Sequence, residues 1–230
     1  GATLRRVSDT EFEGFRLLGT FCYNPDAVFP MYFVVRVSKQ PKQSGYWKKQ
    51  PEMKGAAAEW DQYSGKYKLY PRYGRDIAGN DIGYYMTFDC AEETQVEVQV
   101  GVSFVSIANA RENLEAEQPV CDFNTVAREA RADWARTLDR VTVEGGTEEQ
   151  RRVFYTALYH TQIHPTVLQD VNGQYPKMEG DEILTTKGNR YTVFSLWDTY
   201  RNLSQLETLL YPDKQIDMVN SMIDMYKEWG

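Results

Sequence analysis

The chain has 230 residues, of which 42% are hydrophobic and 26% are charged, and this composition favours a packed globular protein over a disordered one. The formal net charge is −7 and no cluster of lysine and arginine stands against it, which argues against nucleic acid and anionic membranes as partners. Aromatic residues are numerous, with 16 Tyr, 10 Phe and 5 Trp. Most of them are expected in the core, but an excess also suits sites for the apolar faces of sugars.

The three cysteines, Cys22, Cys90 and Cys121, show neither a CxxC motif nor zinc-binding spacing. One disulfide or three free thiols would fit this count, so the redox compartment stays open. No apolar run approaches the roughly 20 residues of a transmembrane helix, and no signal peptide is visible. The sequence opens within a strand pattern and stops at "MYKEWG" within a helix pattern. We therefore expect a fragment of a longer protein, in which a missing signal peptide carries little weight.

The first hundred residues alternate with a period of two, the pattern of half-buried strands. One such run is "MYFVVRVS" (31–38), and a cleaner one is "TQVEVQVGVSFVS" (94–106). The second run places its apolar side chains on one face, namely Val96, Val98, Val100, Val102 and Phe104. Its polar side chains lie on the other face, namely Gln95, Glu97, Gln99 and Ser103. Turn-rich pieces separate such runs: "YNPD" (23–26), "YSGKY" (63–67) and "DIAGNDIGYY" (76–85). Antiparallel strands joined by loops predict a β-sandwich.

After residue 107 the period changes to that of helices. Helix formers fill "NARENLEAE" (109–117), and Asp122 is a candidate N-cap for a helix over about 123–140. That helix has an apolar stripe: Phe123, Val126, Ala127, Ala130, Trp134, Leu138 and Val141. We expect it to bury Trp134. Thr147 and Gln150 then form a capping box, and the helix that follows has its own stripe: Val153, Phe154, Ala157 and Leu158.

The last part of the chain adds a turn and two helices. Asn172-Gly173 in "DVNGQY" is a favoured two-residue hairpin turn. Two helices are predicted at roughly 195–210 and 213–228, separated by Pro212. The chain thus divides into a β part at 1–106, a helical linker at 107–146 and a helical part at 147–230.

Two short motifs have ordinary readings. His160 and His164 are spaced i, i+4, as a metal pair on one helix face requires. The glutamate of a zinc protease helix is absent, because Thr161 takes its place, so a polar interhelical contact is favoured. Pro165 is expected to end this helix and leave His164 near a rim, where it could donate to a sugar hydroxyl. Asn80-Asp81 in "AGNDIGYY" is interpreted as a β-turn.

"SLWDTYR" (195–201) has two readings that the residues leave open. In the first, Ser195 caps a helix, Asp198 complements the helix dipole, and Asp198 pairs with Arg201 on the surface. In the second, Trp197 stacks on the apolar face of a sugar while the Asp198 carboxylate accepts two hydroxyl groups.

Three long segments in order carry a family resemblance: "GVSFVSIANARENLEAE", "RRVFYTALYHTQIHPTVLQDVNGQY" and "YTVFSLWDTYRNLSQLETLLYPDKQIDMVNSMI". From about residue 12 to its end, the chain resembles glycoside hydrolase family 92, a family of calcium-dependent, inverting exo-α-mannosidases best known from bacteria. The resemblance implies a multi-domain β + α fold. Residues 1–106 would be the later strands of an antiparallel β-sandwich, 107–146 linker helices, and 147–230 the start of an (α/α)6 catalytic barrel.

The resemblance also implies a function for the longer protein. That function is removal of terminal α-linked mannose from glycans such as N-glycans, in a secreted or periplasmic enzyme without membrane insertion. Asp198, with Trp197 beside it and His164 near the rim, would contact the mannose. The general acid glutamate, the general base aspartate and the Ca²⁺ ligands would lie outside this chain. We therefore expect no catalytic residue and no metal site here, and no activity from the fragment alone.

Two alternatives remain. The chain would be a non-catalytic carbohydrate-binding or structural segment, or part of another (α/α)6 glycosidase that acts on glucosides. In every case an incomplete sandwich and barrel should expose large apolar faces.

Overall fold

The computed structural model describes residues 1–19, 27–49, 67–71, 76–91 and 94–229, and these form two compact units, Gly1–Cys121 and Asp122–Gly230. Cys22, the segment 23–26 and most of the segment 63–67 lie outside the described residues. Cys90 is a free thiol.

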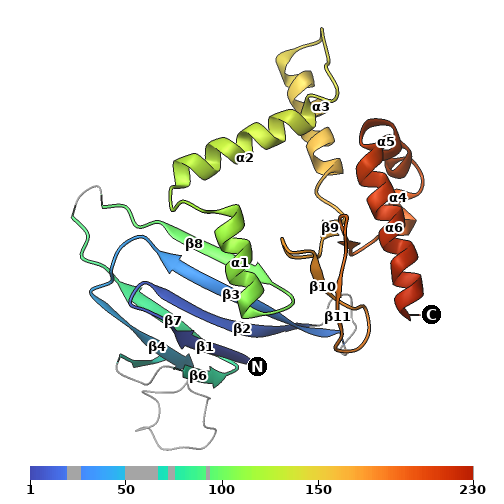
Figure 1. The fold of residues 1–230 in the computed structure, drawn as a ribbon. Coiled ribbons are helices and arrows are strands. Elements are labelled where there is room, and N and C mark those ends of the chain that lie inside the picture. Colours follow the sequence, from blue (N-terminus) through green and yellow to red (C-terminus); the bar gives the residue numbers. More distant parts are fainter. Residues whose placement is uncertain (20–26, 50–66, 72–75, 92–93, 230) are drawn as a thin grey trace, which may run out of the picture. The chain divides into compact units, whose positions relative to one another are not determined.

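The first unit contains two antiparallel sheets, as the alternating sequence predicted (Figure 1). A five-stranded sheet has the order β6-β1-β2-β3-β8, and a three-stranded sheet has the order β5-β4-β7. The strands of the larger sheet are β1 (Ala2–Arg6), β2 (Glu11–Gly19), β3 (Val28–Val37), β6 (Asp76–Gly79) and β8 (Val98–Ser103). Those of the smaller sheet are β4 (Gln43–Lys49), β5 (Tyr67–Tyr70) and β7 (Ile82–Thr87).

Aromatic side chains join the two sheets. The ring of Phe12 on β2 lies 4.7 Å from that of Tyr84 on β7, centroid to centroid. Tyr46 on β4 is 2% exposed, and its hydroxyl accepts a hydrogen bond of 2.9 Å from the backbone N–H of Arg6. Asn80-Asp81 links β6 of one sheet to β7 of the other, so its reading as a turn is confirmed.

A helix covers the other face of the larger sheet. Helix α1 (Ile107–Glu117) begins at Ser106, whose side chain accepts from the Asn109 N–H, and it lies over β8 and β3 (Figure 1). Val34 packs there against Ala110 and Leu114 to form a buried cluster. The helix approaches so closely that a Cβ at Gly101 would lie 2.2 Å from the Ala110 carbonyl oxygen.

This helix corrects the expectation for β8. The alternation is present, but the buried side is Gly101 and Ser103, whereas Val98, Val100 and Val102 are 46–58% exposed. The physical reason is that α1 follows β8 directly in the chain and folds back onto its small and polar face. The exposed valines agree with the expectation that this chain leaves large apolar surface open.

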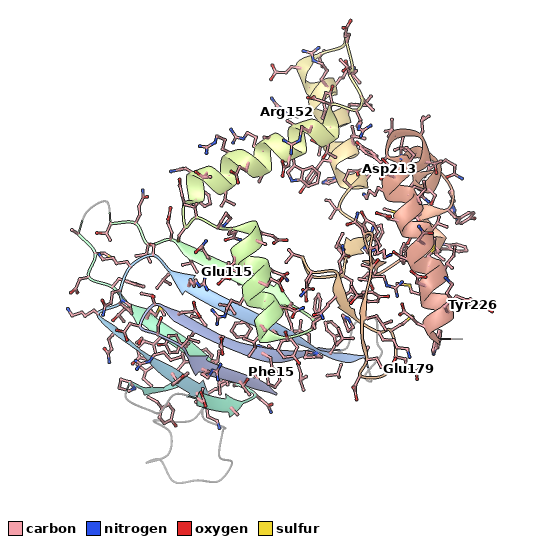
Figure 2. All side chains as sticks on the ribbon, in the orientation of Figure 1. Phe15, Glu115, Arg152, Glu179, Asp213 and Tyr226 are labelled. Carbon is pink, nitrogen blue, oxygen red and sulfur yellow. The ribbon has the colours of Figure 1, made fainter. Side chains whose placement is uncertain are left out.

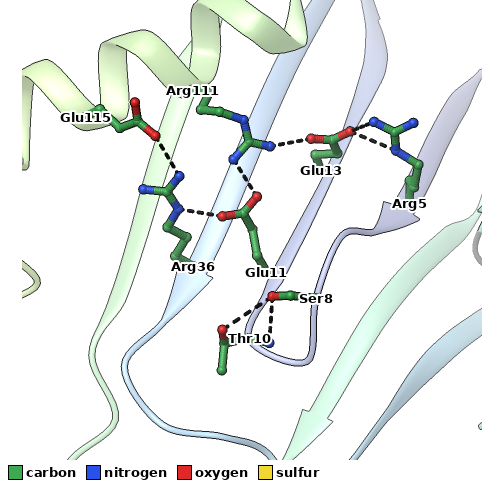
Figure 3. A network of polar contacts seen from close by, with 8 residues as sticks. All are labelled: Arg5, Ser8, Thr10, Glu11, Glu13, Arg36, Arg111 and Glu115. Carbon is green, nitrogen blue, oxygen red and sulfur yellow. Dashed lines mark hydrogen bonds and ion pairs between the residues drawn. The ribbon is translucent and has the colours of Figure 1, made fainter.

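Between α1 and the larger sheet lies a carboxylate–guanidinium network (Figure 3). Arg111 on α1 donates to both Glu11 and Glu13 on β2, at 2.5 and 2.6 Å. Arg36 on β3 donates to Glu11 at 2.5 Å, and Arg5 on β1 donates through its Nε to Glu13 at 2.8 Å. Both glutamates are nearly buried, and both oxygens of each are bound to arginine. Such a network ties helix and sheet together, because a buried charge must be paired.

The second unit is mainly helical. Its helices are α2 (Phe123–Leu138), α3 (Glu148–Thr161), α4 (Leu196–Thr199), α5 (Leu203–Leu210) and α6 (Pro212–Trp229). Short strands between α3 and α4 form two antiparallel pairs: β9 (Thr166–Val167) with β12 (Tyr191–Thr192), and β10 (Gln174–Pro176) with β11 (Ile183–Thr185). The predicted N-cap Asp122 and the capping box of Thr147 and Gln150 are both confirmed.

Several side chains of this unit lie closer to solvent than their sequence pattern predicts. Helix α2 has no buried residue, and the prediction that Trp134 is buried is wrong, since 37% of it is exposed. Its ring packs against Tyr159 of α3, with a centroid distance of 4.5 Å. Of the predicted stripe on α3 only Leu158 is buried. Tyr226 on α6, labelled in Figure 2, is 76% exposed.

Two local predictions need correction. The single helix expected over 195–210 is two short helices, α4 and α5, interrupted at residues 200–202. Asn172-Gly173 does lie in a tight turn, but Gly173 closes it: its N–H donates to the Asp170 carbonyl at 2.8 Å. Its φ of +82° explains why glycine stands there.

Candidate functional site

The segment that leads from β12 into α4 presents Asp198 to solvent. Ser195 occupies the N-cap position, but its side chain makes no capping hydrogen bond. Its hydroxyl donates to Oδ2 of Asp198 instead. Helix α4 has only four residues, so the helix dipole invoked for Asp198 is much smaller than a long helix would give.

Trp197 is also exposed, with 73% of its surface open to solvent. The guanidinium carbon of Arg201 lies 5.2 Å from the centre of its ring and 5.7 Å from that of Tyr200. Within the described residues Arg201 makes no ion pair with Asp198. Arg201 is therefore engaged by aromatic rings, a cation–π contact, and the expected surface pair is absent from this part of the structure.

The two histidines do not share a helix face. Helix α3 ends at Thr161, with Gln162 as its C-cap, so His164 and Pro165 lie beyond it. The i, i+4 argument for a metal pair therefore fails, and the prediction that Pro165 ends the helix is wrong by about one turn. His160 is exposed next to Tyr159, whereas His164 is half-buried and lines a pocket.

That pocket lies wholly within the second unit and has a volume of about 30 Å³. Its walls come from the segment after α3, from α4 and from the next two helices. The apolar lining residues are Pro165, Phe194, Leu196, Leu203, Met218 and Met222. The polar ones are His164, Ser195, Thr199, Ser204, Glu207 and Gln215. Ser195 links the pocket to Asp198 through its hydroxyl, while Trp197 is not among the lining residues.

Glu207 is the buried carboxylate of this pocket, with 2% of its surface exposed. Its Oε1 accepts a hydrogen bond of 2.7 Å from Nε2 of Gln162, whose own Oε1 accepts from Nζ of Lys214 at 3.0 Å. Nζ of Lys214 lies 3.7 Å from Oε2 of Glu207, close enough for an ion pair but not for a hydrogen bond. Among the described residues Oε2 has no hydrogen-bond partner.

Burial acts on both charges of this pair. It raises the pKa of Glu207, against the opposing effects of Lys214 and Gln162. It lowers the pKa of Lys214, although Glu207 acts in the other direction. Burial thus disfavours the charged form of each residue.

The sequence pattern contains a signal for Glu207. Leu203, Leu206 and Leu210 lie at positions i, i+3 and i+7 of α5, and Glu207 falls at i+4 on the same apolar stripe. An acid inside an apolar stripe needs a partner or a function. Gln162 and Lys214, which contact Glu207, lie on other elements. Residue spacing along the sequence does not predict that they come close to Glu207.

In the described part of the chain no three His, Cys, Asp or Glu side chains come together in a group that could hold a metal ion. The pocket lining includes a carboxylate, an imidazole and several hydroxyl groups beside apolar side chains. This mixture suits a sugar, which has polar hydroxyls and apolar C–H faces. In the same part of the chain no helix is long and apolar enough to cross a membrane.

Two family models match the chain along almost its whole length. Residues 1–103 match the N-terminal domain of glycosyl hydrolase family 92, and residues 109–230 match the catalytic domain of the same family. The chain belongs to glycosyl hydrolase family 92. The resemblance of the three long segments is thereby confirmed, as is the fold of a partial β-sandwich followed by the start of a helical barrel.

Solved structures of the family superpose on nearly all of this chain. An α-mannosidase of family 92 from Bacteroides thetaiotaomicron matches with a TM-score of 0.81 and 26% identity, over 99% of this chain and 28% of its own. It has also been solved in complex with mannoimidazole. An inverting mannosidase of family 92 from the same organism matches with a TM-score of 0.80 and 24% identity, with the same coverage, and shares the fold.

A curated relative, an uncharacterized secreted glycosidase of Arthroderma benhamiae, is 29% identical over 126 residues, which is 52% of this chain and 15% of the relative. The chain therefore spans less than a third of the length of the proteins it matches.

Proposed function

We propose that the protein containing this chain is a glycoside hydrolase that removes terminal α-linked mannose from glycans. The observation that supports this most strongly is the match of 99% of the chain to an α-mannosidase of the same family. A complex of that enzyme with mannoimidazole supports mannose as the sugar.

Three residues of this chain are assigned to the sugar. The Asp198 carboxylate accepts hydroxyl hydrogen bonds, with Trp197 beside it as an exposed apolar surface. His164, on the pocket wall, donates to a further hydroxyl. The exposure of Asp198 and the absence of a pair with Arg201 among the described residues support a role toward a ligand over that of a surface cap.

Hydrolysis with inversion needs two carboxyl groups about 6.5–9.5 Å apart, one to protonate the leaving oxygen and one to activate water. The family resemblance places this pair outside the chain, so its own residues bind and orient the sugar. The same resemblance implies Ca²⁺, and a metal ion is associated with the family. The described residues offer no group that fits Ca²⁺. The resemblance places the Ca²⁺ ligands in the part of the longer protein outside this chain.

The substrate class and location follow from the same relatives. Mannose-containing oligosaccharides such as N-glycans are proposed as substrates, and a secreted or periplasmic location is supported by the secreted glycosidase among the relatives.

The test is the activity of the full-length protein on aryl α-mannosides and α-glucosides, with and without a chelator. We expect turnover of the mannoside, release of the inverted anomer, and loss of activity with the chelator. Preference for the glucoside would favour a different (α/α)6 glycosidase. Binding of either sugar without turnover would favour the non-catalytic alternative, and both outcomes would contradict the proposal.

A further inference from the structure

The Glu207 carboxylate is a buried hydrogen-bond acceptor that has no role in the proposed function. It is 2% exposed, lines the 30 Å³ pocket, and has one oxygen fixed by Gln162 at 2.7 Å. The other oxygen has no hydrogen-bond partner among the described residues, and Lys214 stands 3.7 Å from it. Leaving such an oxygen unbound costs free energy, so the site gains when a donor reaches it.

The size of the pocket limits what that donor is. A cavity of about 30 Å³ admits a group of the size of one or two waters but not a sugar ring. The pocket lining combines apolar side chains, with Leu203, Met218 and Met222 among them, and polar ones such as Ser204 and Glu207. A group that fits is therefore short, apolar along its stem and tipped with one hydroxyl. The hydroxymethyl group at C6 of a hexose has this form. In a hexopyranose it is the substituent whose hydroxyl is attached through a carbon outside the ring.

The position of the pocket relative to Asp198 agrees with this. Ser195 lines the pocket and at the same time donates its hydroxyl to Asp198. Under the proposed function, a sugar ring held at Asp198 would lie next to Ser195 and hence next to the pocket. Lys214 and Gln162 hold Glu207 in place from α6 and from the end of α3.

We propose that Glu207 is a specificity-determining residue, whose Oε2 binds the C6 hydroxyl of the terminal hexose inside this pocket. This inference rests on the proposed function. In this proposal the group that occupies the pocket is an uncharged hydroxymethyl group. This assignment also predicts poor acceptance of sugars that lack the group, because a site built to bind a hydroxyl discriminates against the analogue without it.

The experiment compares two substrates and three proteins. The substrates are an aryl α-mannoside and its 6-deoxy analogue. The proteins are the full-length wild type, Glu207→Gln, and Glu228→Gln as a matched control. Glu228 is another buried carboxylate of the second unit: its side chain is 8% exposed and it pairs with Arg190, but it does not line the pocket.

We expect the wild type to prefer the mannoside over the 6-deoxy analogue by roughly 10- to 100-fold in kcat/KM, the range of a hydrogen bond to a charged group. Glu207→Gln should lose roughly tenfold on the mannoside but change little on the 6-deoxy analogue, so that the preference shrinks. Glu228→Gln should keep the preference of the wild type. If Glu207→Gln shows no native melting transition, Glu207→Asp is measured in its place.

An unchanged preference in the Glu207 variant, whether activity falls on both substrates or on neither, would overturn the inference. So would a wild type that does not distinguish the two substrates. In both cases mannoside turnover by the wild type would leave the proposed function standing. A wild type that turns over neither mannoside would instead contradict the proposed function itself.

Discussion

The two units bury glutamate side chains in different surroundings. In the first unit Glu13 is 2% exposed, and Arg5 and Arg111 bind its two oxygens. In the second unit Glu207 is equally buried, but Gln162 binds only one of its oxygens and the residue lines a pocket. Both oxygens of Glu13 are engaged by arginine, which leaves neither for a ligand. One oxygen of Glu207 has no hydrogen-bond partner among the described residues and could accept a hydrogen bond from a ligand. Burial alone therefore does not distinguish these two acids, and the proposal for Glu207 rests on the state of its second oxygen.

The largest effect should come from breaking the network of the first unit. Arg111→Ala leaves two nearly buried carboxylates short of a partner, and breaking a buried pair in this way costs about 3–5 kcal/mol. We expect the melting temperature of the full-length protein to fall by roughly 10 °C. The control is Arg136→Ala, which breaks an exposed pair with Asp133 and should change little. Equal effects of the two substitutions would show that the network adds nothing to stability.

Asp198→Asn addresses the proposed sugar contact in the second unit. The change keeps the shape and removes the charge, so kcat/KM of the full-length enzyme on an α-mannoside should fall roughly 100-fold, about 2.7 kcal/mol. The melting temperature should hardly change, since the side chain is exposed. A surface cap predicts the reverse, a stability loss near 1 kcal/mol with normal kinetics. Measuring kcat/KM beside the melting temperature separates the two.

A smaller effect is expected where α1 meets β8. A side chain at Gly101 would collide with the Ala110 carbonyl oxygen at 2.2 Å and with Cβ of Leu114 at 2.6 Å. Gly101→Val should therefore destabilise the first unit by about 2 kcal/mol, the usual range for overpacking, as measured by thermal melting. Asp89→Asn, which weakens an exposed ion pair with Lys42 in the same unit, is the control and should cost less than about 0.5 kcal/mol. An unchanged melting temperature in Gly101→Val would mean that the helix does not lie so close.

The smallest effect is the change in the stability contribution of Glu11 with pH. Burial acts to raise the pKa of Glu11, but hydrogen bonds and charge from Arg36 and Arg111 outweigh it and hold the pKa below the ordinary value of 4.5. A lowered pKa contributes stability above pH 4.5, and this contribution is lost as the pH falls through the folded-state value.

The matching measurement is the melting temperature of the wild type and of Glu11→Gln from pH 7 to pH 3. The difference between the two should be constant down to about pH 5 and shrink below it. Glu148→Gln, at an exposed pair with Arg152, serves as the control. A difference that grows toward acid would contradict the sign of the shift.

Local patterns predicted much of the fold, because hydrogen-bond periodicity and caps are properties of neighbouring residues. The alternation in β8, the N-cap Asp122 and the capping box at Thr147 are present as expected. The valines of β8 did not predict which face of the strand is buried. That face is determined by α1, which packs closely against Gly101 because this residue has no side chain. Likewise, the exposure of Trp134 depends on which elements pack against α2. The sequence of α2 alone does not identify those elements.

The candidate site divides in the same way. Asp198 and Trp197 were visible as residue types near a helix start, although that helix proved to be only four residues long. His164 was visible as a polar residue near a predicted helix end. Glu207 became visible only when the fold brought Gln162, Lys214 and the pocket walls around it. These partners come from α3 and α6, and no local spacing connects them.

The central claim, that the state of the second oxygen separates the two buried acids, is tested most directly by Glu13→Gln and Glu207→Gln side by side in the full-length enzyme. For each variant the melting temperature and kcat/KM on an α-mannoside are measured. Glu13→Gln should lower the melting temperature and leave kcat/KM of the folded enzyme within about twofold. Glu207→Gln should lower kcat/KM roughly tenfold with a smaller change in melting temperature. Two variants that lose stability alike and keep normal kinetics would contradict the claim.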